Sequence, residues 1–302
     1  MKKLIFMLLA GALFLFTGAA SAEMAAGGAT VADALKDVKI NGFASMGYNQ
    51  NLNKPHSRAI NFRPFNNKDK SFGVEVAQLV FRQDAVEKGS SGFKLDLNFG
   101  NTVPQAIHST GNTGDLDLKQ AYVSYVADIG SGLKLDFGKF ITEMGGEVIE
   151  GYEDWNYNYS RSLIFYYAIP YTHTGARGTY AFNDMFSLTG EVINGWDNVT
   201  DNNGSKSICL HASVMPVKDV AVHLLWLGGP EQTDNDSNKR NIYEANVTAS
   251  NIKDVVLKLD FVYGKEANVD VPAFGPVNAT WSGIAAVARY SLSDKHALNV
   301  RA

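Results

Sequence analysis

The sequence predicts an all-β fold, a transmembrane antiparallel β-barrel of roughly 14 or more strands. Three observations support this prediction: an N-terminal secretory leader, a long series of segments in which apolar and polar residues alternate, and a regular exchange of short turns with long polar loops. After the leader, no stretch approaches the roughly 18 consecutive apolar residues expected of a membrane-spanning helix. If the mature chain crosses a membrane, it must therefore do so with strands.

The first residues have the three parts of a secretory signal. They are a basic start, an uncharged run over residues 4–16 and the small residues Ala20-Ser21-Ala22, after which we expect cleavage. At about 1.5 Å per residue the run is too short for a hydrocarbon core of about 30 Å, which argues against a membrane anchor. The expected domains are the leader, a periplasmic segment and the barrel, over residues 1–22, 23–37 and 38–302.

Composition agrees with a barrel and excludes one class of partner. The chain has 28 Gly, 17 Phe and 13 Tyr but only 8 Pro, and 19% of its residues are charged. Loss of the leader removes two Lys and leaves 25 basic against 31 acidic residues, a net charge of about −6. A nucleic-acid binder would need a basic surplus, so no nucleic-acid partner is expected. The single Cys209 cannot form an internal disulfide.

Alternation with a period of two is clearest in residues 93–99. There Phe93, Leu95, Leu97 and Phe99 share one face, and the other face carries Lys94, Asp96 and Asn98. Residues 133–137, 207–214 and 255–263 alternate as clearly. Weaker segments bring the total to roughly 13, at residues 38–48, 72–83, 116–127, 174–182, 185–194, 219–227, 241–250, 280–290 and 296–302. In a membrane barrel the apolar face meets lipid and the polar face meets the lumen.

The connections between these segments are of two kinds, and the kinds alternate. Residues 128–132, 183–184 and 216–219 are short turns, whereas the long polar connections are residues 49–70, 101–115, 142–172, 195–206, 228–240 and 265–279. Short turns at one rim and long loops at the other are typical of an outer-membrane barrel. A soluble β-sandwich also alternates, but the leader, the loop asymmetry and the aromatic residues near the segment ends favour the barrel.

A sheet in lipid must close, because an unpaired backbone N–H or C=O there costs several kcal/mol. Bacterial barrels usually have an even number of strands. The last alternating segment stops at Ala302 without a final aromatic residue. We therefore expect that the carboxyl-terminal part of the barrel, at least one strand, is missing from this sequence.

An ordered series of short motifs runs through the chain. They are Asn61-Phe62-Arg63-Pro64-Phe65, Ser91 to Gly100, Leu118 to Tyr125, Gly138 to Thr142, Asn158 to Ser162, Pro170 to Gly175 and Val192 to Asp197. This series resembles the β-barrel porin family called type 2 over about residues 38 to 302. The resemblance implies an outer-membrane porin but no particular solute, because the family is defined by its barrel sequence.

Charged residues on the polar faces are the first candidate site. Eight of them should line the pore: Lys94, Asp96, Lys134, Asp136, Arg177, Glu191, Lys258 and Asp260. Rings of lumen charges tune ion selectivity, although each residue alone could be a solvated charge without a special role. The net charge favours a mild cation preference.

Residues 143–172 form the second candidate site. A connection of about 30 residues is longer than ordinary loops and is usually functional or disordered, and this one is too apolar for disorder. We expect it to fold into the lumen and narrow the pore with Glu147, Glu150, Glu153, Asp154 and Arg161, while Glu143 adds a fifth carboxylate. Two alternatives remain open: an external loop packed on its own aromatic residues, or a further strand from Ser162 to Ile169.

Two motifs suggest other chemistry, but the residues around them do not support either function. Asp234, Asp236 and Asn238 begin like a calcium loop, but Lys239 replaces the required Gly, so no metal site is predicted. His211 and Ser213 resemble the base and nucleophile of outer-membrane phospholipase A, whose pair faces lipid. Here both residues should face water in the lumen. No catalytic residue is therefore assigned.

The predicted function is passive diffusion of ions and small polar solutes through an outer-membrane porin. Two alternatives are a lipid hydrolase that uses His211 and Ser213, and a closed barrel that acts as an adhesin or structural protein. Roughly 13 visible strands already exceed the eight of a barrel filled by its own side chains. The expected partners are outer-membrane lipid, the diffusing solutes and further copies of the chain in a homotrimer, and no cofactor is expected.

Overall fold

The computed structural model describes residues 36–100 and 116–302. The predicted leader, most of the segment 23–37 and the predicted loop 101–115 lie outside the described residues. The sheet belongs, apart from its first residue Lys39, to the unit formed by residues 40–302. Within the described ranges, no helix has the length and apolar character needed to span a bilayer.

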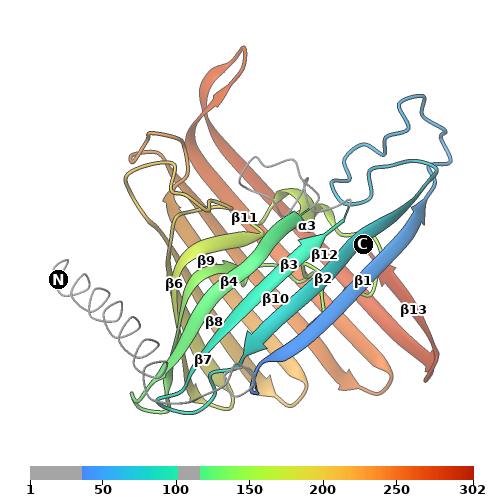
Figure 1. Ribbon diagram of the computed structural model, residues 1–302. Helices are drawn as coiled ribbons and strands as arrows, with labels where there is room; N and C mark the ends of the chain where they lie inside the picture. The colour runs from blue at the N-terminus through green and yellow to red at the C-terminus, as the bar shows by residue number, and fades with distance from the viewer. Residues whose placement is uncertain (1–35, 101–115) are drawn as a thin grey trace. The chain divides into compact units, whose positions relative to one another are not determined.

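The described residues form thirteen strands and a short helix (Figure 1). The strands are β1 (Lys39–Asn49), β2 (Ser71–Gln83), β3 (Ser91–Phe99), β4 (Leu116–Ala127), β5 (Leu133–Ile141), β6 (Thr172–Asn183), β7 (Phe186–Ile193), β8 (Ser207–Val217), β9 (Val220–Pro230), β10 (Lys239–Ile252), β11 (Val255–Val271), β12 (Gly275–Ser293) and β13 (His296–Arg301). The helix is α3 (Leu163–Tyr167), between β5 and β6. Each segment with alternating residues is a strand, which confirms the all-β prediction.

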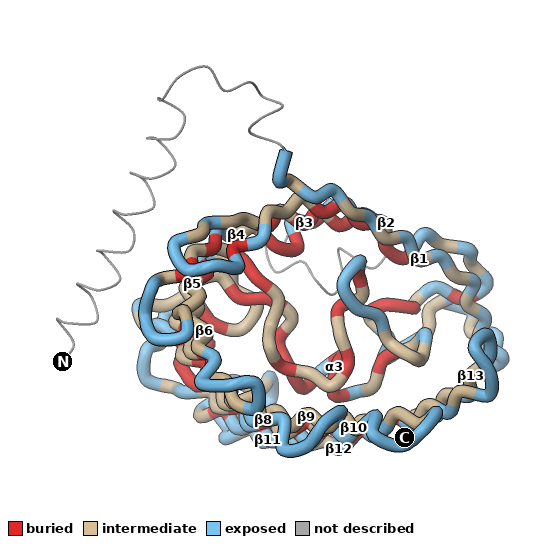
Figure 2. The backbone as a smooth tube through the Cα atoms, turned by 90° about the horizontal axis from the view of Figure 1, so that it is seen from below, coloured by how far each residue is buried: buried red, intermediate tan, exposed pale blue. Residues whose placement is uncertain are grey.

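The strands form one sheet in sequence order, with β1 and β13 as its edges in the described part of the chain. Neighbouring strands from β2–β3 to β12–β13 run antiparallel. Seen from below, the sheet curls into a ring that surrounds α3 (Figure 2). The sheet is not closed, and the expected total of 14 or more strands stays a prediction.

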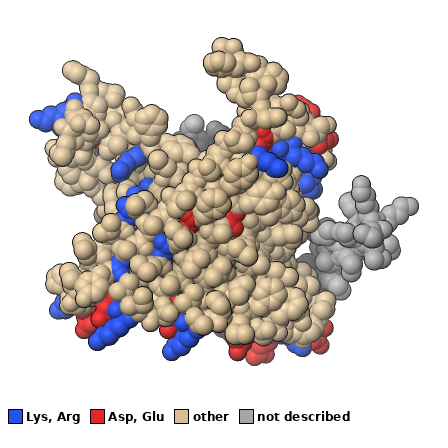
Figure 3. Space-filling model, turned by 180° about the vertical axis from the view of Figure 1, so that it is seen from behind, with Lys and Arg blue, Asp and Glu red and all other residues tan. Residues whose placement is uncertain are grey.

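The two faces of the sheet reverse the pattern of a soluble protein. In β3, Lys94, Asp96 and Asn98 are buried, whereas Phe99 is 41% exposed and the leucines between them are half-buried. Large apolar side chains are exposed on the outer face of most other strands, among them Leu210, Leu224, Leu259 and Ile284. Seen from behind, charged side chains gather at the two rims, and scattered ones lie on the wall between them (Figure 3). An apolar outer band between charged rims suits lipid rather than water.

Connections at one end of the strands are short. β6 and β7 are separated by two residues, as are β8 and β9 and also β10 and β11, and Asp219 and Asp254 adopt positive φ in these turns. One predicted long loop is wrong: residues 265–279 belong to a hairpin in which β11 continues to Val271 and β12 begins at Gly275. The alternation there is too weak to detect, because the hairpin projects beyond the rest of the sheet and buries little (Figure 1).

A β-bulge in β4 changes which residues face inward. Asp96 pairs with Gln120 and Leu97 pairs with Leu118, so Lys119 is an extra residue in the ladder. As a result, the consecutive residues Lys119 and Gln120 are both buried. The bulge explains why residues 116–127 alternate less clearly in the sequence than residues 93–99.

The loop-side ends of the strands carry an apolar cluster on the inner face. Its wall members lie near the ends of strands, and Phe140, Ile193, Leu227, Ile242 and Val262 are fully buried. The opposite side of the cluster comes from Met144, Ile149, α3 and the residues that follow it, together with Phe65. The interior therefore holds a packed core as well as polar groups.

Candidate functional site

The connection between β5 and β6, residues 142–171, lies against the concave face of the sheet; we call it the inserted loop (Figure 2). Side chains from strands around the ring contact it, as the following pairs show: Gln78–Tyr152, Lys94–Glu153, Lys119–Ile149, Arg177–Glu143, Glu244–Gly145, Asp260–Gly146, Trp281–Ala168 and Arg301–Glu147. These residues belong to β2, β3, β4, β6, β10, β11, β12 and β13. The loop thus spans the interior instead of projecting from the rim.

The inserted loop enters the interior at two glycines. Gly145 N donates to Glu244 Oε1 at 2.8 Å, and Gly146 N donates to Asp260 Oδ2 at 3.0 Å. Gly145 has φ +110°, and a Cβ there would lie 2.8 Å from Glu147 O and from Ile169 Cδ1. Glycine is required at this position because both its backbone angle and its contacts exclude a side chain.

Glu143 joins a network of charges on the inner face of β5, β6 and β8. Arg177 Nη1 donates to Glu143 Oε1 at 2.6 Å, and Arg177 Nη2 donates to Asp136 Oδ2 at 2.8 Å. His211 Nδ1 lies 3.5 Å from Glu143 Oε2. Burial alone would raise the pKa of Glu143, but hydrogen bonding with His211 and the charge of Arg177 outweigh it and lower the pKa.

Glu147 and Glu150 are held by arginines and by the backbone of the loop. Arg301 Nη1 donates to Glu147 Oε1 at 2.8 Å, and the N–H of Ser162 donates to Glu147 Oε2 at 2.6 Å. Arg161 Nη2 donates to Glu150 Oε2 at 2.5 Å. These carboxylates are largely buried, so their charges stabilise the loop and are less available to passing ions.

Glu153 and Asp154 are the exposed carboxylates of the loop. Glu153 accepts a hydrogen bond from Lys94 Nζ and lies 3.5 Å from Arg82 Nη1, yet its side chain is 46% exposed. Asp154 is exposed and accepts the N–H of Trp155. Of the predicted constriction residues, these two remain in contact with water.

The second part of the loop is a short helix and not the strand that one alternative expected. Ser162 is its N-cap and accepts a hydrogen bond from Phe165 N at 3.2 Å. Ile164, Phe165 and Tyr166 are buried, and the Phe165 ring lies 5.5 Å from the ring of Phe65. Capping and aromatic packing stabilise a turn of helix here, where the backbone has no neighbouring strand with which to form hydrogen bonds.

The exit of the loop is fixed by a carboxylate from the connection between β7 and β8. Asp197 Oδ1 accepts the N–H of Tyr171 at 2.6 Å and that of Thr172 at 2.9 Å. Burial raises the pKa of Asp197 to about 6 against the effect of these hydrogen bonds. Asp197 therefore ties the start of β6 to its neighbouring loop.

The eight predicted wall residues do not form one ring. Lys94, Arg177 and Asp260 contact the inserted loop as described, Asp136 reaches it through Arg177, and Lys258 Nζ lies 3.5 Å from Gly146 O. Asp96 is bound by Gln78 and Gln120 instead. Glu191 is buried beside Arg177 in the ladder, and Lys134 is 43% exposed. Their role in ion selectivity stays a prediction.

Five of the eight wall residues paired above with the inserted loop were not among the predicted site residues: Gln78, Lys119, Glu244, Trp281 and Arg301. Lys119 is shifted inward by the bulge, and Arg301 lies in the weakly alternating last segment. Glu244 could have been found from its alternation with Tyr243 and Ala245, which face outward. Arg301 alternates in the same way with Leu298 and Val300, so among the charged residues only Lys119 depends on the folded register.

The geometry of His211 does not suit the lipid-hydrolase alternative. His211 Nε2 lies 2.9 Å from His223 Nδ1, and the His211 side chain is buried on the inner face. Within the described ranges, no hydrogen bond links His211 to Ser213, and no group of His, Cys, Asp or Glu is arranged to hold a metal ion.

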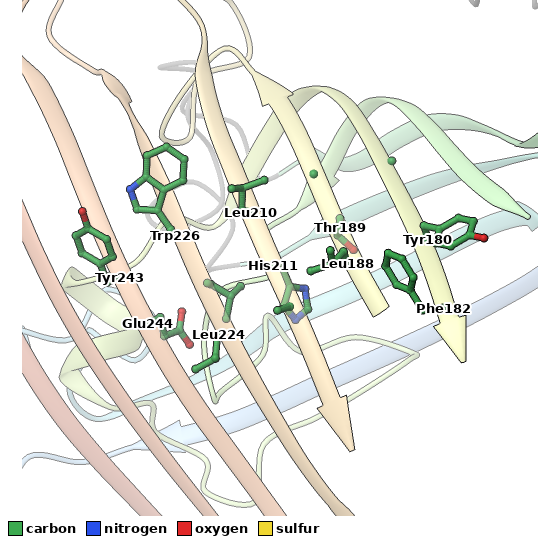
Figure 4. A pocket seen from close by; sticks show the side chains of 14 residues that line it. Tyr180, Phe182, Leu188, Thr189, Leu210, His211, Leu224, Trp226, Tyr243 and Glu244 are labelled. Carbon is green, nitrogen blue, oxygen red and sulfur yellow. The ribbon is translucent and has the colours of Figure 1, made fainter. Parts of the chain in front are cut away.

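An open groove of about 730 Å³ lies on the outer face of β6 to β10. Gly178 and Gly190 face each other in the ladder and leave a hollow beside aromatic and aliphatic side chains, among them Tyr180, Phe182, Leu210, Trp226 and Tyr243 (Figure 4). This groove belongs to the apolar outer band and is separate from the interior.

Comparison with known proteins gives a family match. The profile of the family described as "Putative beta-barrel porin-2, OmpL-like" matches residues 37–302. No curated protein matches the chain. Similar solved structures include a loop L8 deletion mutant of OmpT from Vibrio cholerae (13% identity, 88% of this chain and 80% of that chain, TM-score 0.49) and OmpF of Salmonella typhi in complex with daunomycin (13%, 87% and 88%, TM-score 0.44). The outer membrane channel DcaP of Acinetobacter baumannii is a third (10%, 91% and 92%, TM-score 0.43).

Proposed function

The chain belongs to the family of beta-barrel porins described as "Putative beta-barrel porin-2, OmpL-like", and we propose that the inserted loop sets the narrowest part of its diffusion path. As a porin of the bacterial outer membrane, the protein provides a passive channel. The observation that carries the proposal is that residues 142–171 contact inner side chains from β2 to β13. A segment fixed at so many points of the ring leaves less room for solutes than the sheet alone would.

We infer that charge selectivity comes mainly from the exposed carboxylates of the loop. Glu143, Glu147 and Glu150 each have a cationic partner and are the less exposed carboxylates; Glu153 pairs with Lys94 and Arg82 but is 46% exposed, and Asp154 is exposed. The mild cation preference expected from the net charge would therefore depend on Glu153 and Asp154. Their effect should weaken with salt, because the Debye length falls from about 10 Å at 0.1 M to about 3 Å at 1 M.

The test is single-channel conductance of the mature protein in a planar bilayer. Val148 and Asn156 already exchange two hydrogen bonds, of 2.9 and 2.8 Å, so deletion of residues 149–155 joins two neighbours with little distortion. We expect this deletion to raise conductance at both low and high salt, because its effect is steric.

A matched deletion controls for the removal of chain in general. Asn268 N donates to Asn278 Oδ1 at 3.1 Å at the base of the projecting hairpin, so deletion of residues 269–277 also joins neighbours. We expect conductance to stay unchanged in this variant. If the folded 149–155 deletion conducts like the unaltered protein, the inserted loop does not form the constriction.

We propose no catalytic role for His211 and Ser213, because His211 is buried on the inner face and bonded to His223. Homotrimeric assembly, removal of residues 1–22 and a periplasmic location of residues 23–37 are further proposals. Crosslinking of the purified protein tests the assembly, and N-terminal sequencing tests the removal of residues 1–22.

A further inference from the structure

We propose that a polar cavity on the turn side of the inserted loop is a binding subsite for small organic carboxylates. The cavity has a volume of about 180 Å³, and its polar lining includes Arg82, Lys94, Tyr122, Ser124, Lys134 and Glu153. Arg82 and Lys94 lie near the short connection between β2 and β3, and Lys134 lies near the turn that precedes β5. The proposal rests on the proposed function, because it places the subsite next to the constriction.

Two cations of this cavity face each other on neighbouring strands. Arg82 and Lys94 are direct partners in the β2–β3 ladder, where like charges repel. The Lys94 side chain is only 8% exposed, so its ammonium group needs an anion close by. Glu153 provides this anion, since it accepts from Lys94 Nζ and lies 3.5 Å from Arg82 Nη1. Arg82 and Lys94 thus form a binding position for one carboxylate, and Glu153 of the inserted loop occupies it.

Donors remain in the cavity beyond those that Glu153 uses. Arg82 Nε is buried and has no hydrogen-bond partner within the described part of the chain, so the guanidinium must turn before this donor can reach a solute. Asp84 is the other carboxylate at Arg82, 3.4 Å from Nη1. Lys134 is 43% exposed and lies 3.9 Å from Asp136, which Arg177 and Ser124 bind more closely. An arginine fork binds a carboxylate through two parallel hydrogen bonds, so a solute carboxylate has a place at Arg82 when Glu153 moves away.

Glu153 is suited to exchange with a solute. It lies on the loop at a point where its neighbours Tyr152 and Asp154 are also exposed, and its side chain is 46% exposed. A cavity of about 180 Å³ is of a size that suits a small organic acid better than a sugar oligomer.

Isothermal titration calorimetry of the detergent-solubilised mature protein with succinate tests the subsite. Saturable binding is expected in the unaltered protein. Arg82→Gln should weaken binding about tenfold, the loss typical of a charge-assisted hydrogen bond. Glu153→Gln should tighten binding several-fold, because the internal competitor loses its charge. Lys134→Gln, at an exposed position, should weaken binding and serves as a second variant if Arg82→Gln does not fold.

Lys88→Gln is the matched control. It removes a positive charge at the same rim, but Lys88 pairs with Asp128 outside the cavity. Succinate affinity should be unchanged there. Equal affinity for chloride or inorganic phosphate would overturn the assignment to carboxylates. No tightening in Glu153→Gln would overturn the idea that the loop carboxylate occupies the solute's position.

The outcome can be separated from that of the proposed function. Conductance of the 149–155 deletion is measured in potassium chloride, a solution without carboxylates. It therefore reports on the constriction alone. The same deletion removes Glu153, so it should bind succinate more tightly in calorimetry, as Glu153→Gln does. Higher conductance without tighter succinate binding supports the constriction and contradicts the subsite. Tighter succinate binding without higher conductance supports the subsite and contradicts the constriction.

Discussion

The two arms of the inserted loop are fixed by different kinds of contact. The first arm, residues 142–161, makes most of the hydrogen bonds and ion pairs with the wall, such as those of Glu143 and Glu147, and adds only Met144 and Ile149 to the apolar cluster. The second arm, residues 162–171, is held by burial of Ile164, Phe165 and Tyr166 in the apolar cluster. Directional contacts with the wall therefore position the polar arm, and burial in the cluster positions the apolar arm.

The largest effect is expected when the apolar arm loses its central ring. Phe165 is 2% exposed, so Phe165→Ala removes about 3–5 kcal/mol of packing stability. The strands should remain folded while the arm detaches, which limited proteolysis would reveal as new cleavage within residues 142–171. Leu163→Ala is the control because Leu163 is 67% exposed. Equal protease resistance of the two variants would contradict the division into arms.

A smaller effect is expected when a pair within the polar arm is broken. Arg161→Gln leaves Glu150 without its cation and should destabilise the arm by about 1–3 kcal/mol. The freed carboxylate should also increase cation selectivity, which the reversal potential in a potassium chloride gradient measures. The increase should be clear at 0.1 M and muted at 1 M. A reversal potential that is equal at both salt concentrations would argue against a charge effect.

The contact between the arms can be tested at Gly145. Gly145→Ala should destabilise the loop by about 1 kcal/mol or more, because the new Cβ strains a positive φ and meets Ile169. Gly89 has φ +83° with open space around it, so Gly89→Ala measures the backbone strain alone. The difference between the two variants in protease susceptibility isolates the contact. No difference would mean that the arms are not coupled there.

The smallest effect is expected at the exposed end of the polar arm. Asp154 has no ion-pair partner among the described residues, so Asp154→Asn should leave stability within about 0.5 kcal/mol of the unaltered protein. Cation selectivity should fall slightly at low salt. A large loss of stability would show that Asp154 supports the fold, contrary to its exposure.

Local alternation made the strands predictable. In residues 93–99 each inward residue is polar and each outward residue is apolar, and the same rule located all thirteen strands. The rule failed where burial on one face is incomplete, as in the hairpin of β11 and β12 beyond residue 264. It also failed at Lys119, where a bulge shifts the ladder by one residue.

The sequence by itself determined the wall, because the period of a strand lies in adjacent residues and needs no distant partner. It also identified residues 143–172 as unusual by their length and carboxylates. Only the tertiary structure decided which charges meet. Glu147 and Arg301 are 154 positions apart, and Lys94 and Glu153 are 59 apart. Such pairs depend on the curvature of the sheet and the path of the loop, which no local pattern records.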